Sequence, residues 1–119
     1  MSCDVSLVMD DLCPHCAGIL GERTVWQDGT THNLARMAQE AGIDYVLWRP
    51  EECDPPIRTA AEVLPILRVG LELLRSDPVR FRKYDAPNGW GTYPDLVRFV
   101  EEYIKACESF PAARIEVSR

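Results

Sequence analysis

The chain has 119 residues, 46% of them hydrophobic, which is enough apolar material for one hydrophobic core but not for two. Its formal net charge of -6 disfavours a general electrostatic attraction to nucleic acids and anionic membranes. No stretch approaches the roughly 20 apolar residues of a membrane span, and residues 1–10 lack the basic start of a signal peptide. We therefore expect one domain over residues 1–119, located in the cytoplasm, that binds neither nucleic acid nor membranes.

The first predicted elements are two strands. Over residues 3–9, apolar side chains alternate with mostly polar ones, as in a strand that is buried on one face. Residues 23–27, RTVWQ, are predicted to form a second strand that ends at the Asp-Gly turn signal of residues 28–29. A cysteine-bearing loop connects the two segments, and we expect them to pair as an antiparallel ribbon.

Helical patterns begin after these strands. Residues 32–41 follow Thr31, a good N-cap, and stop at Gly42, which supplies a left-handed C-cap. Residues 43–48, IDYVLW, are apolar but too short for periodicity to distinguish a buried strand from a helical turn, so both assignments stay open. Residues 49–56 are rich in prolines and acids and are predicted to form a loop.

The strongest helical pattern covers residues 59–76, TAAEVLPILRVGLELLRS. Its apolar side chains recur at helical spacing over about half of the circumference, so this face must be buried. Thr59 and Glu62 form the T-x-x-E pattern of a capping box at the start of the helix. Pro65 has no backbone N–H to donate, so we expect a bend or a 3₁₀ first turn.

The rest of the chain predicts one more long helix and a final strand. Thr92 is expected to cap a helix whose apolar face includes Cys107 as a core residue. Residues 113–118 alternate apolar and polar side chains and are predicted to form a strand. Three strands and three helices in the order ββ-ααα-β favour an α+β fold, in which a small antiparallel sheet of about three strands packs against three helices.

Cys13 and Cys16 form the sharpest local motif, C-P-H-C. Two thiolates at this spacing are half of a tetrahedral zinc site, so zinc is a candidate cofactor. The local sequence lacks the other two ligands, for which the candidates are Cys3, His15, His32 and Cys53. Five cysteines are an odd number in a chain without an export signal, so we expect no structural disulfide.

Two other interpretations of the C-P-H-C motif stay open. The motif resembles the active-site tetrapeptide of periplasmic thioredoxin-fold oxidases, which implies a thiol–disulfide oxidoreductase. In such enzymes the first cysteine sits at the start of a helix, whereas here Gly18 and Gly21 interrupt the helix that should follow. The remaining alternative is a pair of exposed, reduced thiols in a loop.

Catalysis has no other support in the sequence. The acids of residues 51–52 and 101–102 are adjacent pairs, whose side chains diverge on a helix or a strand and do not face one substrate. The chain has no G-x-S-x-G, no phosphate-binding glycine loop and no H-E-x-x-H. We therefore favour a binding protein over an enzyme.

Four strings, THNLARMAQEAG, LWRPEE, APNGWGTYPDLVRFVEEYIKAC and the terminal EVSR, occur in an order and spacing that resemble a family of small uncharacterised proteins of bacteriophage and prophage genomes. The resemblance covers residues 31–119, and the family has no assigned reaction. It implies a small accessory protein that acts by binding a host protein, in the host cytoplasm if the chain is phage-encoded. The motif positions are Thr31, His32, Asn33, Trp48, Arg49, Pro50, Asn88, Gly89, Trp90, Gly91, Tyr93, Ser118 and Arg119.

The same strings predict a ligand pocket. Backbone N–H groups in the first turn of a helix attract anions, and Arg49 adds a planar charged fork that suits a carboxylate or a phosphate. The predicted ligand is small and anionic, such as a nucleotide, and the predicted ligand-binding residues are His32, Asn33, Trp48, Arg49, Asn88 and Trp90. The alternative, in which the Trp90 indole packs into the core and Arg49 pairs with a neighbouring acid, stays open.

Overall fold

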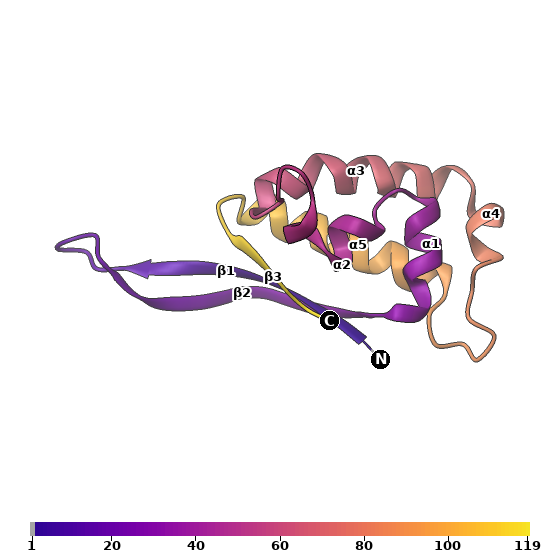
Figure 1. The fold of residues 1–119 in the computed structure, drawn as a ribbon, viewed down its shortest axis with the longest axis horizontal. Helices are drawn as coiled ribbons and strands as arrows, with labels where there is room; N and C mark the ends of the chain where they lie inside the picture. The colour runs from indigo at the N-terminus through magenta and orange to yellow at the C-terminus, as the bar shows by residue number, and fades with distance from the viewer. Residues whose placement is uncertain (1) are drawn as a thin grey trace.

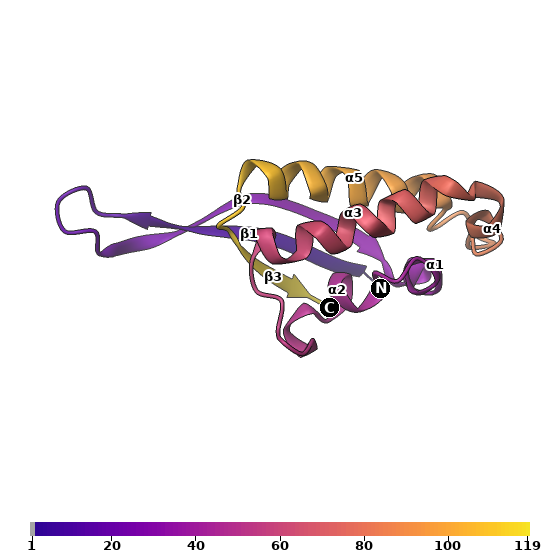
Figure 2. The ribbon, with the colours of Figure 1, turned by 90° about the horizontal axis from the view of Figure 1, so that it is seen from above.

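The computed structural model describes residues 2–119, which form a three-stranded antiparallel sheet with helices on one face (Figures 1 and 2). The strand order is β2-β1-β3, with β1 (Ser2–Leu12) in the centre between β2 (Ile19–Thr31) and β3 (Arg114–Ser118). The helical segments are η1 (His32–Leu34), α1 (Ala35–Glu40), α2 (Asp44–Trp48), η2 (Pro50–Glu52), α3 (Ala60–Ser76), α4 (Pro78–Arg82) and α5 (Tyr93–Ser109). The predicted α+β fold is confirmed.

β1 and β2 form a longer ribbon than the sequence predicted. β1 continues past the predicted residues 3–9, and β2 exceeds the predicted residues 23–27 at both ends. The prediction that the second strand ends at residues 28–29 was wrong, because these residues pair with residues 4–5 of β1. Pairing with β1 satisfies the backbone groups that would otherwise bond within a turn, so Asp28 and Gly29 remain part of β2.

The far half of this ribbon stands away from the rest of the molecule. β3 pairs only with residues 4–8 of β1, so beyond that point β1 and β2 have no third strand beside them. Residues 9–23, which we call the arm, project past the helices (Figure 1) and stretch the molecule to 55 × 26 × 24 Å. Cys13 and Cys16 lie at the tip of the arm.

α3 forms much as its sequence predicts. Thr59 Oγ1 accepts a hydrogen bond from the Glu62 N–H at 3.4 Å, and Glu62 Oε1 accepts one from the Thr59 N–H at 3.1 Å, which completes the capping box. The helix is α-helical from Ala60 onward, without the 3₁₀ first turn that was one expected effect of Pro65. Two hydrogen bonds stabilise its first turn: the Ala60 N–H donates to the Ala113 carbonyl oxygen and the Ala61 N–H to the Pro111 carbonyl oxygen, each at 2.9 Å. Pro65 lies on the exposed side, where water can bind the carbonyl oxygen that its ring leaves unpaired.

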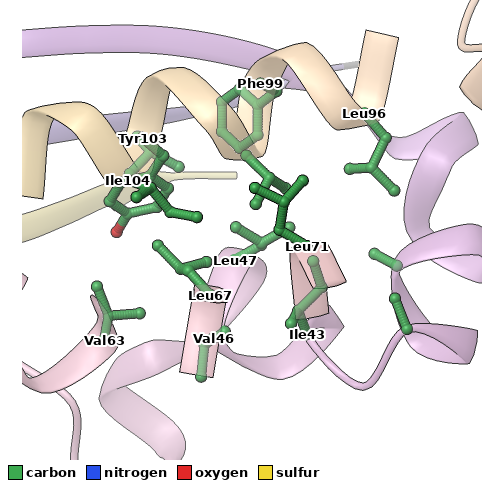
Figure 3. Close-up of a cluster of buried hydrophobic side chains, with 14 of the residues drawn as sticks. Ile43, Val46, Leu47, Val63, Leu67, Leu71, Leu96, Phe99, Tyr103 and Ile104 are labelled. Carbon is green, nitrogen blue, oxygen red and sulfur yellow. The ribbon is translucent and has the colours of Figure 1, made fainter. Parts of the chain in front are cut away.

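The core lies between the sheet and the pair formed by α3 and α5, which run side by side above it (Figure 2). The sequence left residues 43–48 open; residues 44–48 are helical as α2, with Ile43 as the N-cap, and this segment closes one side of the core. Cys107 is buried there, as predicted. Figure 3 shows side chains of the α2 segment, α3 and α5 meeting in the core: Ile43, Val46, Leu47, Val63, Leu67, Leu71, Leu96, Phe99, Tyr103 and Ile104.

Tyr103 carries a buried polar atom within this core. Its ring stacks on Trp26 with 5.0 Å between centroids, and its hydroxyl has no hydrogen-bond partner within residues 2–119. Burial raises the pKa of Tyr103 well above its ordinary value, since a phenolate would lose its hydration. Burial of this unpaired hydroxyl therefore lowers the stability of the folded state.

Tyr103→Phe is expected to leave the free energy of unfolding near pH 7 unchanged or to raise it by up to about 1 kcal/mol. Above about pH 10, Tyr103 ionises when unfolded but not when folded, so the wild type loses stability as the pH rises and the variant avoids that loss. Urea unfolding at pH 7 and about pH 10.5 measures both effects. Tyr45→Phe, at an exposed tyrosine, is the control. A clear loss of stability at pH 7 would show that the Tyr103 hydroxyl makes a favourable interaction after all.

Candidate ligand-binding groove

An open groove lies where η1, α1, α2 and the end of β3 meet. Its volume is about 510 Å³, within the roughly 300–1,000 Å³ typical of small-molecule sites. α2 and the residue that follows it contribute four of the seven lining residues, since residues four apart on a helix share a face. The lining residues are His32, Ala35, Asp44, Tyr45, Trp48, Arg49 and Arg119.

His32 and Trp48 are joined at the base of the groove. The Trp48 indole Nε1 donates a hydrogen bond to His32 Nδ1 at 2.9 Å, and the two rings lie 6.0 Å apart. Trp48 is only 8% exposed. It therefore forms part of the wall, and its N–H is already used, so it offers a ligand little more than apolar contact.

Two arginines, Arg49 and Arg119, line the groove. Arg119 Nη1 donates to the Trp48 carbonyl oxygen at 2.8 Å and to the Glu51 carboxylate, and Arg49 Nη1 donates to Glu52 Oε2 at 2.7 Å. The hydrogen bond from Arg49 to Glu52 raises the already high pKa of Arg49, so this guanidinium is always charged. A guanidinium has five N–H donors, and these bonds occupy only Nη1 of each group.

Asn33, Asn88 and Trp90 do not line the groove. Asn33 Nδ2 donates to the Trp90 carbonyl oxygen at 2.9 Å, and Asn88 Oδ1 accepts from the Trp90 N–H at 2.9 Å, so both asparagines hold the loop before α5. The Trp90 indole is 74% exposed and does not pack into the core. Gly91 has a φ of +116°, and a Cβ there would lie 2.8 Å from Thr31 Cγ2, so the loop needs a glycine at this close approach.

The expected anion site at the first turn after Thr31 is not formed by backbone N–H groups. Thr31 Oγ1 accepts from the Asn33 N–H at 3.2 Å, and this turn is a three-residue 3₁₀ segment. The N-cap role of Thr31 is thus confirmed. Because the Asn33 N–H already donates to Thr31 Oγ1, it is not available to bind a ligand. Of the six predicted ligand-binding residues, the groove brings together His32, Trp48 and Arg49.

Sequence reasoning missed Tyr45, Asp44 and Arg119 as groove residues. Tyr45 is 45% exposed, more than any other aromatic ring lining the groove. Had residues 43–48 been assigned to a helix, the spacing of positions 44, 45, 48 and 49 would have placed these side chains on adjoining faces. Arg119 reaches the groove across 71 positions of sequence, which no local pattern reveals.

The predicted metal ligands Cys13 and Cys16 lie at the tip of the arm, far from the groove (Figure 1). Within the described residues 2–119, no three His, Cys, Asp or Glu side chains are grouped so that they could hold a metal ion. Three of the candidate completing ligands belong to the body: Cys3 is buried in the core, Cys53 lies beside Arg49, and His32 is bonded to Trp48. All five cysteines are unpaired thiols in the structure.

No protein-family model, curated protein or solved structure matches this chain. The resemblance to phage and prophage proteins therefore stays a prediction. In the part of the chain that the structure describes, no helix is both long and apolar enough to cross a membrane.

Proposed function

We propose that the protein binds a small anionic ligand with a flat ring, such as a nucleotide, in this groove. The observation that carries the proposal is that one groove holds the guanidinium groups of Arg49 and Arg119 together with the exposed ring of Tyr45. Guanidinium groups bind phosphates and carboxylates through paired N–H donors. An exposed aromatic ring offers a face on which a planar group stacks.

The groove has an acidic residue at the start of α2 and a basic residue just after its end. Asp44 begins α2 and Arg49 follows its last residue, so their Cα atoms are about 7.5 Å apart along the helix axis. A nucleotide lying along α2 would place its phosphate on Arg49 and Arg119 and its base over Tyr45. The Asp44 carboxylate would then accept hydrogen bonds from N–H groups of the base, which favours a base with such donors on its outer edge.

Arg49→Ala is expected to weaken binding of a nucleoside monophosphate by about 1–3 kcal/mol, or roughly 5- to 150-fold. The melting temperature should change little, because Arg49 is exposed and its ion pair with Glu52 is a surface pair. Calorimetric titration with guanosine and adenosine monophosphates, beside inorganic phosphate alone, measures the effect. His32→Ala is a poorer test, because it also removes the hydrogen bond to Trp48.

Arg68→Ala is the matched control, since Arg68 is equally exposed and forms a similar ion pair with Glu108 outside the groove. It should leave the affinity unchanged. Tyr45→Phe should retain binding and Tyr45→Ala should weaken it, because stacking needs the ring and not the hydroxyl. Equal effects of Arg49→Ala and Arg68→Ala, or no heat and no thermal shift with any of these anions at millimolar concentration, would contradict the proposal.

An accessory role in a host cell, with a host protein as partner, is a separate proposal that rests on the resemblance alone. Capture of a stoichiometric host protein from lysate would support it. That result would not bear on the groove unless Arg49→Ala also abolished the capture.

A further inference from the structure

The tip of the arm holds its two thiols in a tight turn. The Cys13 N–H donates to the Gly18 carbonyl oxygen at 2.8 Å, and the Ala17 N–H donates to the Cys13 carbonyl oxygen at 2.9 Å. The backbone N–H groups of His15 and Cys16, together with the Cys16 thiol, hydrogen-bond to the Cys13 sulfur. The two thiols are therefore neighbours in one turn, as two ligands of a single metal ion must be.

This pair has two of the four ligands that a closed zinc site needs. A closed structural zinc site takes four ligands in a tetrahedron. Within residues 2–119, no third metal-binding side chain joins the two cysteines. The arm carries them to one end of the molecule, so the cysteines of the body are too distant to contribute (Figure 1).

We propose that the arm tips of two copies of this chain bind one zinc ion between them, through Cys13 and Cys16 of each copy. A two-fold axis through the metal makes the two half-sites equivalent, so identical chains supply the four thiolates that neither has alone. Binding releases the thiol protons and forms four Zn–S bonds without any change in oxidation state. The proposal does not depend on the groove.

The side chains around the tip favour a second copy as the source of the missing ligands. Leu12, Ile19 and Leu20 flank the motif and are each more than half exposed, which leaves apolar surface at the end of the arm. Two tips that meet at a metal would bury these side chains against one another. The length of the arm keeps the two acidic bodies apart, so their repulsion is screened by salt.

The test uses the full chain in a non-thiol reductant, with zinc chloride added, and measures mass in solution and metal content. We expect a dimer with one zinc per two chains, which a chelator converts to a metal-free monomer. Cobalt in place of zinc should give the visible absorption of a tetrahedral site and the near-ultraviolet bands of thiolate ligands. Cys13→Ser and Cys16→Ser should each be monomeric and lose at least tenfold in zinc affinity.

Cys53→Ser is the control, because Cys53 lies in the body and should leave both the dimer and the zinc unchanged. The cysteine variants should melt at the wild-type temperature in chelator, since the tip adds nothing to the core. A monomer in zinc, one zinc per chain, or a dimer that survives chelator would each overturn the proposal. A dimer that forms only without reductant would mean a disulfide between tips, and would overturn it too.

Discussion

Leu67→Ala is expected to lower the free energy of unfolding by about 2–5 kcal/mol. Leu67 is fully buried in the middle of α3, among side chains from α2 and α5 (Figure 3). Truncation removes three carbon atoms, Cγ and the two Cδ methyl groups, from a packed site that helices close on several sides. The surroundings can collapse only partly, so the loss of burial is joined by the cost of a cavity.

Val69→Ala is the matched control on the same helix. Val69 is 68% exposed, so its truncation should change stability by less than about 0.5 kcal/mol. Urea unfolding followed by circular dichroism compares the two variants with the wild type. Similar small effects at both positions would mean that the face of α3 that carries Leu67 is not buried.

Gly70→Ala is expected to destabilise the protein by about 2 kcal/mol, although alanine is the better helix former by about 1 kcal/mol. A Cβ on Gly70 would lie 2.3 Å from Ile43 Cγ2, well inside contact distance. Ile43 is buried and leads directly into α2, so it cannot swing away into solvent. The variant must push α3 and the α2 segment apart, which loosens the packing on both sides.

Ile43→Ala tests this explanation because it removes the atom that clashes. In that background, Gly70→Ala should cost much less or become stabilising, with a coupling energy of at least about 1 kcal/mol in the double-mutant cycle. If Gly70→Ala instead raised the free energy of unfolding of the wild-type chain, α3 and the α2 segment would be able to move apart without loss of stability. If the effects of the two substitutions were additive, the loss of stability in Gly70→Ala would not come from the contact with Ile43.

The groove and the arm tip are distant enough to be tested independently. Cys13→Ser should not alter nucleotide affinity, and Arg49→Ala should not alter zinc content or dimer mass. Substitutions more than about 10 Å apart without shared partners usually act additively. A variant that disturbed both readouts would indicate a change in the whole fold rather than in either site.

The sequence by itself determined the elements whose signals are local and repeated. The apolar stripe and capping box of α3 predicted that helix to within a residue, and the stripe of α5 placed Cys107 in the core. The alternation in β1 predicted the burial of Cys3, Val5 and Leu7, but it fails after Leu7, where a register shift in the pairing with β2 accompanies the burial of Val8. These patterns are readable because a helix or strand that packs on one side repeats its burial every 3.6 or 2 residues.

Only the tertiary structure decided the rest. The outer half of β2 is exposed on both faces, so it has no apolar alternation, and its strand form depends on pairing with β1. α2 is too short for a period and is helical because the sheet, α3 and α5 enclose its buried side chains. Arg119 meets Trp48 because β3 ends beside α2, which is a consequence of sheet order. Contacts between distant segments depend on how complete elements pack, and that information is spread over the whole chain.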